Sequence, residues 1–168
     1  MKLTHRAIDL ALDRDYLLER HCRINYACDS PWARVIPYEK YRANWFVMPE
    51  QMEKGFLGAL RDSMEDPRAI AEIIENENGE TVAYFWGSLW EEKEAGFSCL
   101  ELQDLYVEET FRKQGVASQL FAYAEEKARA IGANLVRSGT GCENAASIAM
   151  HKKLGYEIYR YEFEKLLK

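Results

Sequence analysis

The stretch Cys99–Gly132, CLELQDLYVEETFRKQGVASQLFAYAEEKARAIG, decides the fold of this 168-residue chain. Residues 99–107 predict a strand, and residues 116–131 predict an amphipathic helix that ends at Gly132. A basic turn with a glycine, residues 112–115, joins the two. This order presents main-chain N–H groups to a phosphorylated ligand, because a helix start carries about half a positive charge and several unpaired donors.

The strand departs from regular alternation in its middle. Leu100 and Leu102 share one face, whereas Leu105 and Val107 fall on the other face if the strand is regular. A strand that is buried on both faces would explain this pattern. We favour a β-bulge at residues 103–104, which would put both apolar pairs on the core side, bend the strand and free main-chain groups for a ligand.

The turn after this strand resembles the acetyl-CoA-binding core of the GNAT superfamily, the acyl-CoA-dependent N-acyltransferases. The family signature is Arg or Gln, two residues, Gly, one residue, then Gly or Ala, and Arg112, Gly115 and Ala117 fit that spacing. The strand before the turn, the helix after it and a second matching block downstream support the match. The resemblance covers residues 70–161.

The second matching block is residues 144–156. It has Asn144, a small residue three positions later (Ser147) and a closing glycine–aromatic pair at 155–156, as the family does. His151 stands where the family most often has tyrosine. Because seven residues make nearly two helical turns, these polar side chains share one stripe, which we expect to face the cleft.

The resemblance implies an α/β, single-domain GNAT-type fold over residues 1–168, with a mixed, mostly antiparallel central sheet of six to seven strands and helices on both faces. The bulged central strand would be splayed from its parallel neighbour. Residues 68–74 and 81–90 predict antiparallel strands, and residues 135–138 predict a parallel strand reached through a helical crossover. Residues 156–166 predict one last strand or two short ones.

The resemblance also implies acetyl-CoA as co-substrate and no metal. The coenzyme's diphosphate would bind the main chain around Gly115, and its pantetheine arm would lie along the bulged strand. The main-chain N–H of Tyr106 or Val107 would polarise the thioester. The candidate cofactor-binding residues are Leu105, Tyr106, Val107, Arg112, Lys113, Gln114, Gly115, Val116, Ala117, Ser118, Asn144 and Ser147.

Amine acetylation needs a base for the ammonium and a proton for the departing thiolate. An alkyl ammonium has a pKa near 10.4, so reaching the neutral amine at pH 7 costs about 4.6 kcal/mol. The resemblance gives two catalytic carboxylates: Glu101 aligns with the base of histone-type members, and Asp104 with a substrate-amine contact of the polyamine branch. Which one is the base stays open, with a lean to Glu101; an exposed strand residue or an ion pair is an equal alternative for either. His151 would donate or relay the proton to sulfur.

Residues 102–107 look most like the polyamine (spermidine/spermine) acetyltransferase branch, which has Glu where Gln103 stands. The expected function is transfer of the acetyl group of acetyl-CoA to a primary amine of a small cationic or amino-group substrate, by direct attack in a ternary complex. The alternatives are a protein N-terminal or lysine amine acetyltransferase and a non-catalytic, acyl-CoA-binding regulatory module.

The composition of the chain limits the partners and the cellular compartment that we expect. A net charge of −6 argues against nucleic-acid binding and modestly favours a cationic small molecule. The four cysteines lack metal-ligand spacing and predict reduced thiols. No apolar run is long enough for a membrane span, and the N-terminal residues lack a signal-peptide core, so we expect a cytoplasmic protein without membrane partners. The oligomeric state stays open, with a homodimer as one option.

Overall fold

The computed structural model describes residues 1–28, 35–46 and 52–165. The first half of the chain forms β1 (Thr4–Ala7), α1 (Leu10–Cys28), α2 (Tyr38–Phe46), the π-helical turn η2 (Met52–Phe56) and α4 (Leu57–Met64). The second half forms β2 (Ile70–Glu75), β3 (Thr81–Glu92), β4 (Phe97–Val107), the 3₁₀ turn η3 (Glu109–Phe111), α5 (Val116–Ala130), β5 (Leu135–Ser138) and α6 (Ala145–Lys153).

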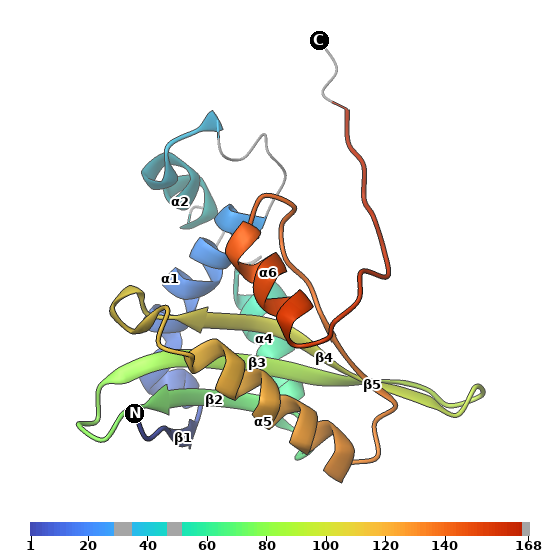
Figure 1. Ribbon diagram of the computed structural model, residues 1–168. Coiled ribbons are helices and arrows are strands. Elements are labelled where there is room, and N and C mark those ends of the chain that lie inside the picture. The colour runs from blue at the N-terminus through green and yellow to red at the C-terminus, as the bar shows by residue number, and fades with distance from the viewer. Residues whose placement is uncertain (29–34, 47–51, 166–168) are drawn as a thin grey trace.

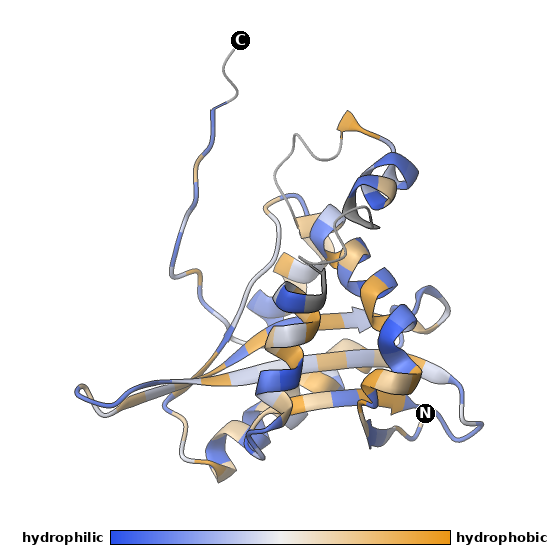
Figure 2. Cartoon of the chain, turned by 180° about the vertical axis from the view of Figure 1, so that it is seen from behind, coloured by the Kyte–Doolittle hydropathy of each residue, from blue (hydrophilic) through white to orange (hydrophobic). Residues whose placement is uncertain are grey.

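The strands of the described residues form one mixed sheet in the order β1-β2-β3-β4-β5. The first four strands pair antiparallel, and β5 pairs parallel to β4, as the helical crossover predicted. In Figure 1, α5 and α6 lie in front of the sheet, and α1 and α4 lie behind it. Figure 2 shows the back face, which α4 crosses. The predicted mixed sheet with helices on both faces is therefore confirmed.

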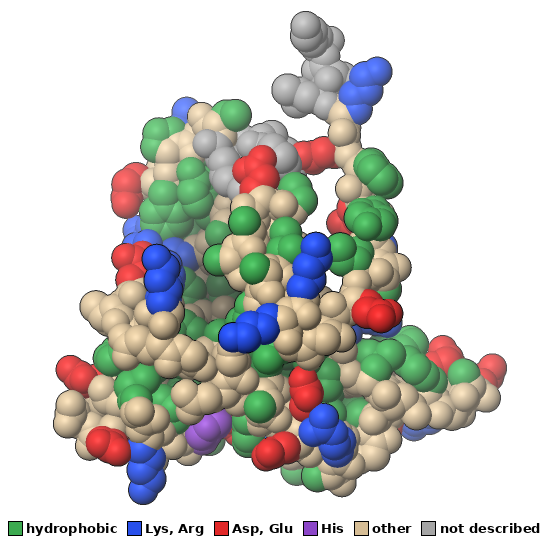
Figure 3. Space-filling view, viewed as in Figure 1, with side chains coloured by type: hydrophobic (Ala, Val, Ile, Leu, Met, Phe, Trp, Pro, Cys, Tyr) green, Lys and Arg blue, Asp and Glu red, His purple; other side chains and the backbone are tan. Residues whose placement is uncertain are grey.

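The predicted count of six to seven strands is wrong, because residues 156–165 form no strand in the structure. Gly155, at φ +85°, closes α6, and the chain then leads away from the sheet instead of along β5. The segment stands clear of the body in Figure 3. Tyr161 and Phe163 are 72% and 92% exposed, so the segment that was predicted to form a last strand does not pack against the sheet.

Two apolar cores, one on each face, hold the helices to the sheet. Between the sheet and α5, Phe85 and Leu100 pack against Phe121. Between the sheet and the back helices, Tyr84 packs with Leu17 of α1. Full burial of side chains of this size contributes roughly 1.5–3 kcal/mol each. The sheet is thus fixed from both sides, which gives β4 a rigid setting.

The predicted β-bulge is present in β4. Trp86 lies opposite Asp104, but the next residue of β3, Gly87, lies opposite Leu102, so Gln103 is an extra residue. A Cβ atom on Gly87 would lie 3.2 Å from Leu102 Cδ2, so the glycine lets the two strands approach at the bulge.

The bulge inverts the phase of the strand as predicted. Its consequence is that apolar residues from both halves of β4 contact the same core on the α5 side: Leu100, Leu102, Leu105 and Val107. Tyr106 packs in the core on the α1 side instead.

The bulge is also where β4 and β5 part. Their pairing ends at Leu102 and Ser138, so within the described structure no strand pairs with residues 103–107 on the β5 side. The chain after β5 turns toward α1: a Cβ atom on Gly141 would lie 2.8 Å from the Cα atom of Cys28. This close approach brings the connection between β5 and α6 against the C-terminal end of α1.

Candidate active site

The turn before α5 is open and basic. Gly115 caps the 15-residue helix in the left-handed region, at φ +82°, and a Cβ atom there would meet nothing within 4 Å. Arg112 and Lys113 beside it are exposed. The first N–H groups of a helix have no partner within the helix, and they attract anions. The turn therefore fits a diphosphate.

Arg112 ties this turn to the end of β4. Its Nε donates a hydrogen bond to the carbonyl oxygen of Val107 at 3.0 Å. Its guanidinium lies 5.2 Å from the ring centre of Tyr106, a distance at which a cation is attracted to an aromatic face. Predicted cofactor-binding residues of the turn and of the strand are thus brought together.

The second half of β4 offers main-chain groups on one side only. Residues 104–107 pair with β3, and no strand of the described structure pairs with them on the other side. Main-chain polar groups need a partner wherever water is excluded. This edge of β4 can therefore bind the amide groups of an extended ligand.

The polar stripe of α6 forms as predicted, but part of it serves the helix itself. Asn144 Oδ1 accepts a hydrogen bond from the N–H of Ser147 at 3.2 Å and so caps α6. His151 Nδ1 lies 2.8 Å from the carbonyl oxygen of Ser147. Because a carbonyl only accepts, Nδ1 carries the proton, and Nε2 of the neutral ring is an acceptor.

His151 Nε2 and Thr140 Oγ1 are buried without a hydrogen-bond partner in the described structure. The His151 ring is held edge-on by Phe121 and Tyr156, with ring centres 5.0 and 5.5 Å away. Buried polar groups almost always have a partner. Two such groups on the β5–α6 connection and α6 therefore indicate a place where a ligand supplies the missing bonds.

Asp104 lies in a closed setting on the α1 face of the sheet. It is 4% exposed, and its Oδ2 accepts a hydrogen bond from the hydroxyl of Tyr84. Burial, with the nearby Asp104 charge, raises the pKa of Tyr84 well above its usual value. The phenol therefore stays protonated and keeps donating to the carboxylate.

The second partner of Asp104 is His21 of α1, which the sequence reasoning missed. His21 Nδ1 lies 2.5 Å from Asp104 Oδ2, and the two residues are 83 positions apart. The imidazole stacks on Phe56 with 3.8 Å between ring centres and 6° between planes. No local pattern marks this histidine, because it lies inside a helix whose spacing shows only which side chains are apolar.

Glu101 lies on β4 before the bulge. It is half-buried and stands opposite Ser88 of β3 and Arg137 of β5. No hydrogen bond or ion pair joins its carboxylate to Asp104 or His151 within the described residues. The three predicted catalytic residues therefore do not form one hydrogen-bonded group.

The comparison with protein families gives a match that spans most of the chain. The model of the "Acetyltransferase (GNAT) family" matches residues 35–156. The chain belongs to the acetyltransferase (GNAT) family. The matched region includes the bulged strand, the turn at Gly115 and the whole of α6, so the sequence resemblance to this family is confirmed.

Other acetyltransferases share part of the sequence or the fold. The aminoalkylphosphonate N-acetyltransferase of Salmonella typhimurium is 36% identical over 67 residues, 40% of this chain and 44% of that protein. The L-methionine sulfoximine/L-methionine sulfone acetyltransferase of Pseudomonas paraeruginosa is 35% identical over 80 residues, 48% and 46% of the two chains. The chain thus spans about half the length of these curated relatives.

A solved structure matches over nearly the whole length. The aminoglycoside antibiotic 6'-N-acetyltransferase of Acinetobacter baumannii superimposes with a TM-score of 0.62 at 16% identity, covering 99% of this chain and all of that one. At this identity the likeness shows the GNAT fold alone.

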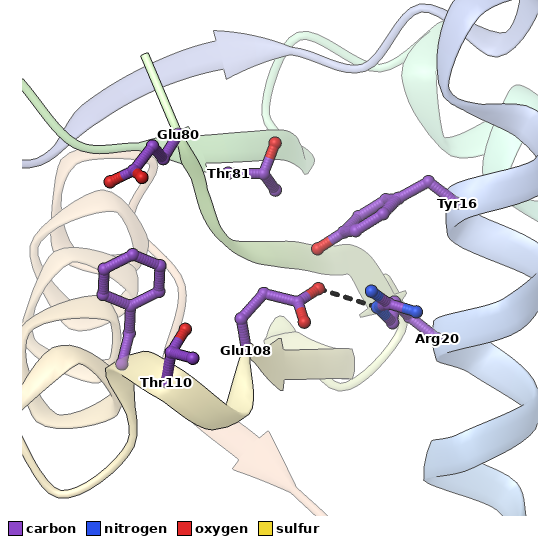
Figure 4. Close-up of a pocket in the computed structure, with 7 residues that line it drawn as sticks. Tyr16, Arg20, Glu80, Thr81, Glu108 and Thr110 are labelled. Carbon is purple, nitrogen blue, oxygen red and sulfur yellow. Dashed lines mark hydrogen bonds and ion pairs between the residues drawn. The ribbon is translucent and has the colours of Figure 1, made fainter. Parts of the chain in front are cut away.

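A pocket of about 600 Å³ lies beside the C-terminal end of β4. Figure 4 shows Tyr16 and Arg20 of α1 on one side of it and Glu108 and Thr110 on the other. Arg20 Nε donates to Glu108 Oε1 at 2.7 Å. None of the predicted site residues lines this pocket.

The described part of the chain contains neither a candidate metal site nor a candidate membrane-spanning helix. No group of three or more His, Cys, Asp or Glu side chains there could hold a metal ion. None of the helices described combines the length and the apolar character that a membrane crossing needs.

Proposed function

We propose that this GNAT chain transfers the acetyl group of acetyl-CoA to a primary amine of a small substrate, with residues 1–168 acting as one catalytic unit. One observation carries the proposal: β4 opens beyond Gln103, directly beside the basic turn at Gly115. An extended ligand with a diphosphate at one end is what such a site fits.

The residues present fit acetyl-CoA. Arg112, Lys113 and the first N–H groups of α5 would hold the diphosphate, and the unpaired edge of β4 would hold the pantetheine amides. The main-chain N–H of Tyr106 or Val107 would donate to the thioester oxygen, where negative charge develops during attack. The buried, unpartnered atoms at Thr140 and His151 would gain their hydrogen bonds from the same ligand.

The two buried cysteines, Cys22 and Cys99, are poorly suited to form an acyl-enzyme. Burial raises the pKa of both the Cys22 and the Cys99 thiols, which lowers the fraction present as the nucleophilic thiolate. Neither forms a hydrogen bond with a histidine in the described structure. We therefore propose that the amine itself attacks the thioester carbon.

His151 is proposed as the proton donor to the departing sulfur. Its Nδ1 proton is held by the carbonyl of Ser147, so donation through Nε2 requires the imidazolium form. A base must remove a proton from the acceptor ammonium, and Glu101 remains one candidate because its carboxylate is half-buried rather than enclosed. Asp104 is less suited to touch the amine directly, since it is 4% exposed.

The proposed acceptors are small amino compounds. The names of two relatives, an aminoalkylphosphonate and a methionine-sulfoximine acetyltransferase, describe acceptors of this size for those proteins. Polyamines belong in the same class, although Gln103 replaces one acidic contact of the polyamine branch; its Nε2 donates to Ser88 Oγ at 3.2 Å.

The test is release of free CoA thiol from acetyl-CoA with a panel of amines: aminoalkylphosphonates, amino acids, aminoglycosides, polyamines, a lysine peptide and a free peptide N-terminus. We expect turnover with at least one small amine and none without amine. Turnover with the peptides alone would move the assignment to protein acetylation. Thermal stabilisation by CoA without turnover would indicate a binding module, and no stabilisation at all would sink the acetyltransferase assignment.

A further inference from the structure

We propose that His21, held by Asp104, is the base that takes the proton from the acceptor ammonium. The inference rests on the amine acetylation proposed above and assigns its missing proton acceptor. His21 Nδ1 lies 2.5 Å from Asp104 Oδ2, so the histidine and the carboxylate form a directly bonded pair.

The geometry fixes what each member of the pair can do. Asp104 is almost fully buried, and one carboxylate oxygen accepts from both His21 and Tyr84. His21 keeps 18% of its side chain exposed, against 4% for Asp104. A proton that comes from a substrate therefore reaches the histidine, whereas the carboxylate orients the ring and stabilises its charged form.

The ring has one orientation. It stacks on Phe56 nearly in parallel, and its Nδ1 is committed to the carboxylate. Because Nδ1 carries the proton that bonds to Asp104, proton exchange with a substrate goes through Nε2. Imidazole is the side-chain group that enzymes use most often as a general base.

The position of the pair matches the reaction. Asp104 directly follows the bulge residue Gln103, at the point where β4 leaves β5 and its main chain becomes available to the thioester. His21 reaches this point from α1, on the other face of the sheet from α5. The base and the acyl donor would thus approach the same segment of β4 from two sides.

The step balances as follows. Nε2 of His21 takes one proton from the R–NH₃⁺ group, and the nitrogen lone pair so released forms the new C–N bond to the thioester carbon. The C–S bond breaks with its electron pair going to sulfur. His151 donates its Nε2 proton to that thiolate and is restored by the second nitrogen proton, so amide, free CoA thiol and the His21 imidazolium are formed.

The test compares two matched histidines. His21→Asn keeps an amide that can donate to Asp104 but removes the basic nitrogen. His5→Asn is the control, because His5 Nδ1 also bonds to a carboxylate, Glu72 Oε2 at 2.7 Å, but lies on β1. We expect His21→Asn to lower kcat about 10²–10⁴-fold, the usual range for a general base, with unchanged binding of CoA. His5→Asn should keep the wild-type rate.

A second measurement separates a base from a structural residue. The best acceptor of the amine panel is compared with its fluorinated analogue, whose ammonium has a lower pKa and needs less help to lose its proton. The defect of His21→Asn should shrink at least tenfold with the analogue, and imidazole added to the His21→Ala variant should restore part of the rate.

Each outcome decides the matter. An equal defect with both amines, a loss below tenfold, or an amine-dependent loss in Glu101→Gln instead would overturn the role of His21 and leave the acetyltransferase intact. Wild-type protein that binds CoA but acetylates no amine would overturn the proposed function and this inference together. Binding of CoA by each variant, followed as a thermal shift, shows that the variant is folded.

Discussion

Two regions of the molecule contain the same three chemical groups and put them to different uses. In each, a carboxylate accepts hydrogen bonds from a histidine Nδ1 and a tyrosine hydroxyl. One lies on the α1 face beside the opening of β4, and the other joins β1, β2 and α5. They are the bulge cluster, made of His21, Asp104 and Tyr84, and the edge cluster, made of His5, Glu72 and Tyr123.

The clusters differ in how deeply the carboxylate is buried and in how the hydrogen bonds are divided between its two oxygens. Both bonds of the bulge cluster end on one oxygen of a carboxylate whose side chain is 4% exposed. In the edge cluster each oxygen of Glu72 takes one bond, the side chain is 14% exposed, and Lys127 lies 4.0 Å away. The edge cluster links three elements through a partly solvated carboxylate. The comparison teaches that composition alone does not make a site: the bulge cluster lies beside the gap where β4 and β5 part, whereas the edge cluster lies at the outer strand of the sheet.

The largest expected effect is on kcat, when the carboxylate of each cluster is replaced by an amide. Asp104→Asn should lower kcat about 10³–10⁴-fold, because an amide no longer fixes the His21 tautomer or stabilises the imidazolium. Glu72→Gln, the matched change in the edge cluster, should leave kcat within about twofold while lowering stability slightly. Steady-state kinetics with saturating acetyl-CoA measures both.

The split between kcat and KM tells a positioning residue from a structural one. Asp104→Asn should keep the KM for acetyl-CoA, because Arg112 and the turn at Gly115 lie outside the cluster. A parallel loss of CoA binding would show instead that the substitution disturbs β4 as a whole, and an equal rate loss in Glu72→Gln would erase the distinction between the clusters.

The third histidine, His151, differs from the histidines of both clusters, because its Nδ1 bonds to a carbonyl oxygen and not to a carboxylate. As a proton donor to sulfur it should be replaceable by tyrosine, which the family most often has there, but not by phenylalanine. We expect His151→Phe to lower kcat about a hundredfold, the low end for an acid, because a thiol of pKa near 8.5 leaves readily. His151→Tyr should retain most of the rate; equal rates in all three proteins would remove the acid role.

A substitution of Arg112 tests the binding of acetyl-CoA separately from the chemical step. The Arg112 side chain is about half exposed (48%), and it lies between the end of β4 and the turn. Arg112→Ala should raise the KM for acetyl-CoA about tenfold with kcat nearly unchanged, and the effect should weaken in high salt because exposed charges are screened. Arg129→Ala, at the other end of α5, is the control. An unaltered affinity for CoA would contradict the diphosphate assignment.

Whether the sequence could predict a feature depends on how far apart in the chain the residues that specify it lie. The bulge at Gln103 and the turn at Gly115 are each specified within about ten residues, and both were predicted correctly. A three-residue step in an apolar pattern is enough to place a bulge, because the pleat repeats every two residues.

Features that need distant residues were missed or wrong. His21 meets Asp104 only after α1 has packed on the sheet, and nothing local in a 19-residue helix marks the position that faces the bulge. The prediction of a last strand was wrong for a related reason. Residues 156–165 have a sequence typical of a strand, but whether they pair depends on the direction in which the chain leaves α6. A local sequence pattern can predict which face of a strand each side chain occupies, but it does not predict which other strand pairs with it.

The smallest expected effect compares the two tyrosines. Tyr84→Phe removes a hydrogen bond to a buried carboxylate and should lower the free energy of unfolding by about 1.5–3 kcal/mol, whereas Tyr123→Phe, next to a partly solvated one, should lower it by about 0.5–1.5 kcal/mol. Burial, reinforced by the carboxylate, raises the pKa of Tyr84 above its unfolded value near 10. A raised pKa means that this contribution is fully present below pH 10 and is lost only as the pH rises through the folded value. Urea unfolding at pH 6, 7.5 and 9 should therefore give the same difference between wild type and Tyr84→Phe at each pH, and a difference that shrinks by pH 9 would mean that the phenol ionises with its partner and does not simply donate to it.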